Sequence, residues 1–219
     1  MSQFIGIYGA SGFGKEVMPL VRQQFPTLAQ PQFVFIDDLQ AGTNLNGYPV
    51  FAYRDFIAHP ATQKSVTIAI ANSMVREKLV ARLAEDGIQH LAVQANNAVI
   101  LDEVEIGEGS LLCPFTCLTS NIKIGKFFHA NIYSYVAHDC VIGDYVTFAP
   151  SVKCNGNIHI EDHAYIGTGA VIKQGTPEKP LVIGRGAVVG MGAVVTKSVP
   201  AGVTVIGNPA RILEAKSNF

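Results

Sequence analysis

A glycine-rich turn near the start of the chain could bind an anion. Gly9, Gly12 and Gly14 follow the apolar segment Phe4–Tyr8. They would let the chain turn tightly and bring backbone N–H groups at a helix N-terminus close to a negative charge. The spacing G-x-x-G-x-G differs from the dinucleotide G-x-G-x-x-G, and the Lys-Ser/Thr pair of a P-loop is missing, because Glu16 follows Lys15. The turn therefore predicts a site for a phosphorylated or nucleotide ligand, the alternative being a turn needed only for strand-to-helix packing.

Two acids follow the second apolar segment, Phe33–Ile36, and could bind the same ligand. Asp37 and Asp38 stand at a strand end, and ligands of parallel sheets sit beyond the carboxyl ends of the strands. An acid at this place can bind ribose or sugar hydroxyls or a sugar amine. The alternative is a solvated turn.

Six histidines could transfer a proton near neutral pH. Those other than His138 are expected to be exposed on the surface: His59, His90, His129, His159 and His163. The four cysteines show no zinc-like spacing, and we expect reduced, small core residues of a cytoplasmic protein: Cys113, Cys117, Cys140 and Cys154.

The elements that would position the glycine turn and the acids form an α/β pattern over residues 1–95. Strands alternating with helices predict a small parallel domain of the Rossmann type. Strands are expected at Phe4–Tyr8, Phe33–Ile36, Val66–Ala71 and Leu91–Val93. One helix is expected through Val17, Leu20 and Val21, and another from Met74 to Glu85 behind the cap Asn72-Ser73.

A six-residue period organises residues 96–219. Apolar residues recur in one phase: Ile100, Ile106, Leu112, Leu118, Ile124, Ala130, Val136, Ile142, Phe148, Cys154, Ile160, Ile166 and Ile172. Such a hexapeptide repeat predicts short strands joined by turns, three to each coil of a parallel β-helix, with the repeat residues stacked inside. The phase breaks at Lys173–Pro180, predicted to form an external loop, and resumes at Ile183. A short C-terminal helix is expected at Arg211–Lys216.

The charge and hydrophobicity of the chain argue against nucleic acids and membranes as binding partners. The chain has 16 basic and 17 acidic residues and no block of like charge, so no nucleic-acid surface is expected. The first ten residues do not read as a secretory signal, and no apolar run reaches the about 18 residues of a spanning helix.

The repeats resemble the hexapeptide-repeat acyltransferases, in units such as Ile166–Ala170 and Val189–Ala193 and in the terminal Val205–Ala210. The N-terminal segments Tyr8–Gly12, Asp37-Asp38 and Ala69–Asn72, with Arg76, are similar to those of bacterial nucleotide-sugar N-acetyltransferases, which are grouped with the sialic-acid O-acetyltransferase-like proteins. The resemblance implies a left-handed β-helix, a homotrimer with acetyl-CoA between adjacent prisms, and transfer of acetyl to the 4-amino group of a UDP- or dTDP-linked 4-amino-4,6-dideoxy sugar.

The resemblance also assigns roles to residues, and it implies no metal. His138 would be the general base, with Asp139 as its orienting carboxylate, although neighbours on a straight strand point apart and need a turn to touch. Gly156, one coil further on, would offer its N–H to the acetyl carbonyl. The remaining CoA contacts would be Thr168, Gly190, Asn208 and Pro209. The nucleotide sugar would contact Ala10, Ser11, Gly12, Phe13, Asp37, Asp38, Asn72 and Arg76.

Three alternatives remain open at this point. The acceptor could be a hydroxyl, as in a sialic-acid O-acetyltransferase. The same prism could serve a zinc hydratase, although the pairs His129/His138 and His159/His163 do not match the spacing of its three histidines. The chain could also be an inactive binding module. Thr147 and Phe13 depart from the residues that some relatives carry at these positions.

Overall fold

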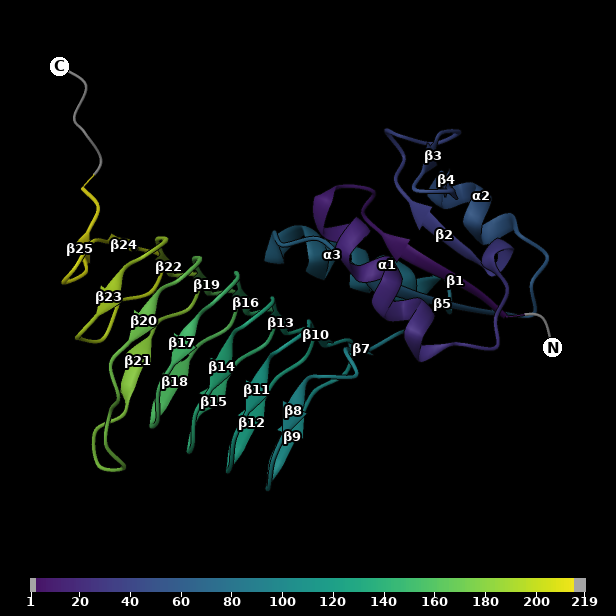
Figure 1. Cartoon of the computed structure of the whole chain (residues 1–219). Helices are drawn as coiled ribbons and strands as arrows, with labels where there is room; N and C mark the ends of the chain where they lie inside the picture. The colour runs from purple at the N-terminus through teal and green to yellow at the C-terminus, as the bar shows by residue number, and fades with distance from the viewer. Residues whose placement is uncertain (1–2, 215–219) are drawn as a thin grey trace, which may run out of the picture. The chain divides into compact units, whose positions relative to one another are not determined.

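The computed structural model describes residues 3–214 of the 219-residue chain. The chain divides into two compact units, Met1–Asn96 and Asn97–Phe219, each with its own hydrophobic core (Figure 1).

The first unit is built on a six-stranded sheet with strand order β3-β4-β2-β1-β5-β6. Its strands are β1 (Gln3–Tyr8), β2 (Phe33–Ile36), β3 (Asn44–Leu45), β4 (Tyr48–Phe51), β5 (Gln63–Ile68) and β6 (Gln89–His90). Neighbours pair in parallel, except for the antiparallel hairpin β3–β4. The central strands are buried along most of their length, as is typical of a parallel sheet covered on both faces.

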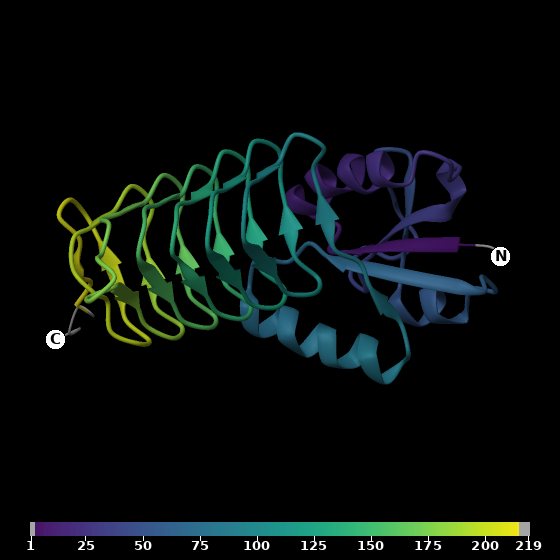
Figure 2. The same ribbon diagram turned by 90° about the horizontal axis from the view of Figure 1, so that it is seen from below.

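Three α-helices connect these strands. They are α1 (Gly12–Gln24), α2 (Tyr53–Ala58) and α3 (Ser73–Glu85), with a short 3₁₀ turn at Gln30–Gln32. The crossover through α1 connects β1 to β2, and the crossover through α3 connects β5 to β6. The two crossovers run toward opposite edges of the sheet. Because parallel crossovers are right-handed, opposite directions put the helices on opposite faces of the sheet, as Figure 2 shows for α1 and α3.

The predicted α/β organisation is confirmed, with shifts in its elements. The third strand runs over Gln63–Ile68 rather than Val66–Ala71, and of the stretch Leu91–Val93 only Val93 is in a strand, β7 (Val93–Gln94). The hairpin β3–β4 and helix α2 were not predicted. Asn46-Gly47, with φ of 53° and 87°, is a two-residue hairpin signal that could have found the first of them.

The second unit is a left-handed parallel β-helix, as predicted. Its strands are β8 (Val99–Ile100), β9 (Val104–Ile106), β10 (Leu111–Leu112), β11 (Cys117–Leu118), β12 (Ile122–Ile124), β13 (His129–Ala130), β14 (Tyr135–Val136), β15 (Val141–Ile142), β16 (Thr147–Phe148), β17 (Lys153–Cys154), β18 (Ile158–Ile160), β19 (Tyr165–Ile166), β20 (Val171–Ile172), β21 (Leu181–Ile183), β22 (Val188–Val189), β23 (Val194–Val195), β24 (Thr204–Ile206) and β25 (Arg211–Ile212). One sheet has the order β23-β20-β17-β14-β11-β8, and another β21-β18-β15-β12-β9. Before the external loop, a residue pairs with the one eighteen positions on, as Ile124 does with Ile142.

The corners of the prism are made by residues with positive φ. One stands at every sixth position from Glu103 to Gly169, and the ten that are not glycine have φ between 53° and 62°. This conformation costs a non-glycine residue roughly 1–2 kcal/mol. Stacking of corner side chains from successive coils offsets part of that cost: the rings of Phe115 and Tyr133 lie 5.0 Å apart and nearly parallel.

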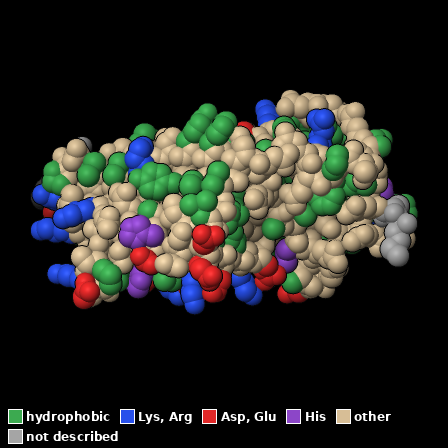
Figure 3. Space-filling view, turned by 60° about the horizontal axis from the view of Figure 1, so that its bottom comes forward, with side chains coloured by type: hydrophobic (Ala, Val, Ile, Leu, Met, Phe, Trp, Pro, Cys, Tyr) green, Lys and Arg blue, Asp and Glu red, His purple; other side chains and the backbone are tan. Residues whose placement is uncertain are grey.

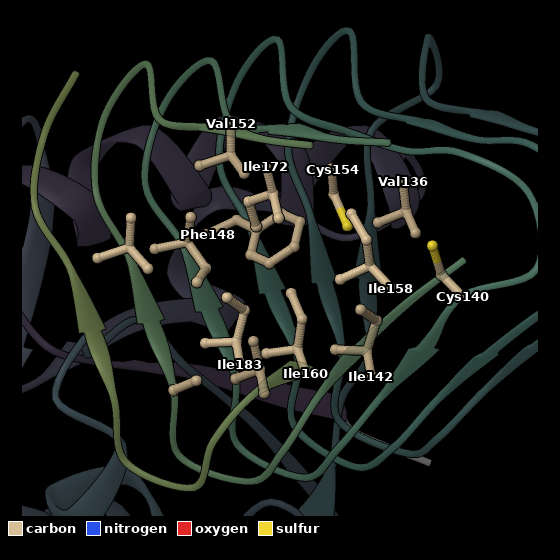
Figure 4. Packing of buried hydrophobic residues seen from close by; sticks show 14 of the residues in the cluster. Val136, Cys140, Ile142, Phe148, Val152, Cys154, Ile158, Ile160, Ile172 and Ile183 are labelled. Carbon is tan, nitrogen blue, oxygen red and sulfur yellow. The ribbon is translucent and has the colours of Figure 1, made fainter. Parts of the chain in front are cut away.

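The predicted repeat residues line the inside of the prism. Those from Leu112 to Ile172 are at most 5% exposed and belong to one buried hydrophobic cluster, against which the partly buried Ile100 and Ile106 pack (Figure 4). Phe148 is at its centre, with its ring edge-on to Phe128 at 5.1 Å. The hexapeptide period is therefore the packing pattern of the core.

Truncating Phe148 is expected to cost about 3–5 kcal/mol of the free energy of unfolding, because the rigid coils cannot close the cavity left by the ring. Urea denaturation of Phe148→Ala and wild type at equal protomer concentration measures this. Val141→Ala on an exposed strand position is the matched control, expected to cost less than about 1 kcal/mol. Equal losses in the two variants would contradict the assignment of the core.

The chain end differs from the prediction. Arg211 and Ile212 form β25, antiparallel to β24, and Leu213 N–H donates to Thr204 O at 2.7 Å. The expected helix at Arg211–Lys216 is therefore wrong over its first residues, because the open edge of β24 offers backbone partners that a one-turn helix would leave unused. Ala215 and Lys216 lie outside the described residues.

The surface carries no large region of one charge on the face shown in Figure 3, where basic and acidic side chains lie side by side. Over residues 3–214, no helix is long and apolar enough to cross a membrane.

Candidate active site

The corner after β14 brings His138 and Asp139 into contact. Asp139 is one of the positive-φ corner residues, with φ of 58°. This is the turn that two neighbouring residues need to direct their side chains together, and His138 Nδ1 lies 2.7 Å from Asp139 Oδ2. The contact expected between the two residues is present.

Residues at the same corner of successive coils form a column along the prism, here called a corner column. The residue before Asp139 in its corner column is polar and binds the second carboxylate oxygen of Asp139. Asn121, one coil earlier, donates from Nδ2 to Asp139 Oδ1 at 3.2 Å. The hydrogen bond with His138, followed by that with Asn121, holds the pKa of Asp139 below its ordinary value. An ionised Asp139 accepts a hydrogen bond from Nδ1–H of His138, so the lone pair of the neutral imidazole is on Nε2.

Replacing Asn121 with Ala is expected to raise the pKa of Asp139, because one donor to the carboxylate is lost. Asp139 contributes stability above its unfolded pKa and loses it as the pH falls through the depressed folded pKa. In Asn121→Ala the folded pKa lies closer to the unfolded one, so less stability is lost and the loss is complete at a higher pH. A ¹³C NMR titration of the Asp139 carboxyl measures the change, with Asn131→Ala, at another corner, as control. An unchanged titration would contradict the hydrogen bond.

Gly156 lies directly beside the imidazole of His138. A Cβ built on Gly156 would stand 2.5 Å from His138 Cε1 and 2.6 Å from Nε2, which no side chain could occupy. The carbonyl of Gly156 accepts from Gly175 N at 3.0 Å. Within residues 3–214 its N–H donates to no backbone or side-chain acceptor. An imidazole nitrogen and a backbone N–H with no acceptor among the described residues therefore lie at one corner.

The same corner column continues into a groove that sequence reasoning did not single out. Strands β14, β17, β20 and β23 pair in succession, so their ends align along the prism. Beyond the ends of β20 and β23 is a groove of about 630 Å³, whose lining includes Lys173, Lys179, Lys197, Thr176 and Ser198. The phase break at Lys173–Pro180, which contains two of the lysines, was the available signal.

The other predicted CoA contacts lie at a different corner. Thr168 and Gly190 follow β19 and β22, strands of another sheet, and Asn208 and Pro209 form an exposed turn after β24. Gly190 is restricted by packing, since a Cβ there would lie 2.7 Å from Ile206 Cγ2. Within a single protomer, these four residues therefore do not lie at the corner that carries His138.

The glycine turn combines packing and open space. Gly9 has φ of 112°, and a Cβ on Gly14 would lie 2.0 Å from Gly9 O, so packing explains these two glycines. Gly12 has no atom within 4 Å of a built Cβ, so packing does not require it. The space lies at the N-terminus of α1, where Ser11 is exposed and makes no side-chain cap. Phe13 is half-buried in the first turn.

Asp37 and Asp38 hold local structure. Asp37 accepts from the N–H groups of Leu39 and Gln40, and more weakly from Ala10 N at 3.4 Å, which ties the glycine turn to the next loop. Asp38 Oδ1 accepts from Tyr53 N at 2.7 Å at the start of α2. Asp38 is exposed.

Asn72 and Arg76 organise the start of α3. The predicted cap is confirmed, since Asn72 Oδ1 accepts from Val75 N at 3.1 Å. Arg76 is fully buried and donates from Nη1 to Ile70 O at 2.8 Å and Ala71 O at 3.2 Å. Arg76 therefore fixes the loop behind the helix terminus from inside.

The remaining histidines are spread over the molecule. His129 is 2% exposed between Leu111 and Thr147 of the neighbouring strands, so its expected exposure is wrong. His159 is exposed, and the half-buried His59 stacks on Phe4 with ring centroids 3.8 Å apart. Among the described residues, no group of three His, Cys, Asp or Glu side chains could hold a metal ion. The four cysteines are free thiols.

Known proteins match the chain along nearly its whole length. The domain family described as the PglD N-terminal domain matches residues 5–83. A GDP-perosamine N-acetyltransferase of Escherichia coli O157:H7 is 51% identical over 208 residues, 94% of each chain. The solved structure of WeeI from Acinetobacter baumannii AYE is 83% identical, with a TM-score of 0.96 over 96% of this chain and 100% of that one. The acetyltransferase domain of PglB from Neisseria gonorrhoeae FA1090, in complex with acetyl coenzyme A, is 27% identical, with a TM-score of 0.84 over 97% and 100% of the two chains.

Proposed function

Because the chain belongs to the family of hexapeptide-repeat nucleotide-sugar N-acetyltransferases, we propose that it transfers acetyl from acetyl-CoA to the 4-amino group of a nucleotide-linked 4-amino-4,6-dideoxy sugar. The observation that carries the proposal is the corner at His138. A histidine paired with an ionised carboxylate stands there beside a glycine whose N–H is uncommitted among the described residues. Acyl transfer to an amine requires a base and an oxyanion donor together.

In the proposed reaction, the sugar amine attacks the thioester carbonyl as its new N–C bond forms. His138 Nε2 takes the proton that the amine releases, and Asp139 stabilises the resulting imidazolium through Nδ1–H. Gly156 N–H donates to the carbonyl oxygen as that oxygen becomes negative. When the C–S bond breaks, the imidazolium returns its proton to the departing thiolate of CoA.

We propose that CoA lies along the corner column that starts at His138. Its thioester would reach His138 and Gly156, and its phosphates would face the groove containing Lys173, Lys179 and Lys197. Lysine ammonium groups are suited to phosphates. The acetyl-CoA complex of the PglB domain supports this choice of donor, since that domain has the same fold.

The nucleotide-sugar acceptor is assigned to the first unit. The supporting observation is Gly12, which packing does not require and which leaves the N-terminus of α1 open to a phosphate. In this proposal Asp37 and Arg76 act by shaping the loops around the ligand, and Asp38, being exposed, has an oxygen available for a hydroxyl.

We propose that the protein works as a homotrimer. The corner with Thr168 and the corner with His138 lie on different edges of one prism. In a threefold ring, the Thr168 corner of one copy would lie beside the His138 corner of the next copy. Phe115 and Tyr133, stacked and more than half exposed, provide an apolar surface for that contact. Light scattering of the purified protein would give three times 23.4 kDa, and a monomer at working concentration would contradict the assembly.

The reaction is assigned to the cytoplasm. The support is chemical: the free thiols suit a reducing compartment, which is also where acetyl-CoA is available.

The test is acetyl-CoA consumption with a panel of acceptors. GDP-perosamine comes first because it is named for the relative at 51% identity, with UDP- and dTDP-linked 4-amino sugars in parallel. The expected product is an N-acetylated nucleotide sugar, identified by mass spectrometry. If only sialic acid were acetylated, the acceptor would be a hydroxyl group and the proposed amine acceptor would be wrong. If no amino sugar were acetylated, the result would favour an inactive binding module.

A further inference from the structure

The peptide bond between Asn155 and Gly156 is held on its carbonyl side from inside the prism. Its N–H is the proposed oxyanion donor. Its carbonyl, Asn155 O, accepts a hydrogen bond from the thiol of Cys140, with Sγ at 3.1 Å. Cys140 is 1% exposed, and its sulfur points into the prism (Figure 4). The same sulfur is 3.6 Å from His138 O, so one buried thiol lies between the backbone of the base and that of the donor.

The side chain of Asn155 is anchored outside the prism to the coils on either side. Its Nδ2 donates to Ile172 O at 2.7 Å, one coil later. Because a carbonyl must face the NH₂ group, the Oδ1 faces Tyr135, whose hydroxyl donates to it at 2.9 Å. Burial raises the pKa of Tyr135, which keeps its phenol in the donor form.

An equivalent inner hydrogen bond occurs six residues earlier in the repeat. Ser134 Oγ donates to Ala149 O at 3.0 Å, over the same fifteen-residue separation as Cys140 and Asn155. There the next residue is Pro150, so that peptide has no N–H to present. Both hydrogen bonds therefore fix a corner of the prism. Only the bond from Cys140 fixes a peptide group whose N–H can donate to an oxyanion.

We infer that Tyr135, Cys140 and the Asn155 side chain form a clamp that fixes the orientation of the Asn155–Gly156 peptide, and that they are positioning residues for the Gly156 N–H. The inference rests on the proposed function. An oxyanion donor stabilises the transition state only if it already points to the place where the negative charge develops. Rotation of the Asn155–Gly156 peptide group would therefore lower the rate of the acetyl-transfer step. A hydrogen bond to the carbonyl also polarises the N–H of the same peptide.

Tyr135→Phe removes one hydroxyl and keeps the ring, so it tests the outer anchor with little risk to folding. We expect kcat to fall about tenfold, with the KM for acetyl-CoA within about twofold of wild type, because the lost interaction matters mainly in the transition state. Tyr165→Phe, on a different sheet, is the matched control and should keep the wild-type kcat.

Cys140→Ser and Cys140→Ala test the inner anchor. Serine keeps a donor and should stay within about twofold of the wild-type kcat, whereas alanine should lose about fivefold. Ser134→Ala removes the equivalent bond at the neighbouring corner and should lower the thermal midpoint without lowering kcat. This pattern separates a role in catalysis from a role in stability alone.

Two results would overturn the inference while leaving the proposed function standing. One is full kcat in both Tyr135→Phe and Cys140→Ala with an active wild type. The other is equal kcat in Cys140→Ser and Cys140→Ala. Absence of acetyl transfer by the wild type itself, with every amino sugar in the panel, would overturn the proposed function and this inference with it.

Discussion

Replacing His138 with Ala is expected to lower kcat by about 10²- to 10⁴-fold, the contribution typical of a positioned general base. The imidazole is held through Nδ1 by Asp139 at 2.7 Å, which leaves Nε2 beside Gly156 to receive the proton. No other base replaces it at this corner, because the neighbouring Asp139 is a carboxylate of depressed pKa. The KM for acetyl-CoA should change little, since the lysine groove is intact.

The measurement is initial-rate kinetics with acetyl-CoA and the acceptor found by the panel. His159→Ala is the control, because His159 is an exposed histidine of the same unit, on another sheet. It should keep the wild-type kcat. Unchanged acetylation by His138→Ala would exclude His138 as the base.

Gly156→Ala is expected to have the second largest effect, a loss of about 10²-fold or more in kcat. The added methyl would stand 2.5 Å from His138 Cε1, far inside van der Waals contact, so either the imidazole or the glycine peptide must move. In both cases the base and the backbone donor separate, and removing one oxyanion donor alone costs about 10²- to 10³-fold. The two effects act on the same reacting atoms.

The control for this glycine is Gly186→Asn. Gly186 is a positive-φ corner residue with open space around a built Cβ, and Asn121 and Asn157 already adopt this conformation at other corners. Gly186→Asn should therefore fold and keep its kcat. Thermal unfolding of both variants separates a local displacement from loss of the fold. Wild-type kcat in a folded Gly156→Ala would contradict the placement of the donor.

Regular spacing made the second unit predictable and left much of the first unit's site uncertain. Thirteen repeat residues in one phase describe the core of the prism, because each coil repeats the contacts of the previous one. Elements made by a single local contact were missed or misjudged. The hairpin at Asn46-Gly47 was not recognised, and Arg211 and Ile212 pair with the edge of β24 instead of continuing as a helix.

The sequence by itself determined the hexapeptide prism, the α/β unit before it, and, through resemblance, His138, Asp139 and Gly156 as one group. Only the tertiary structure decided how they are arranged. The positive φ of Asp139 turns two adjacent side chains together, and the eighteen-residue coil brings Gly156 against the imidazole. It also showed that Arg76 and Asp37 hold the backbone of their loops. The physical reason is that a repeat specifies which residues face inward, whereas hydrogen bonds between coils and loops depend on neighbours that are distant in the chain.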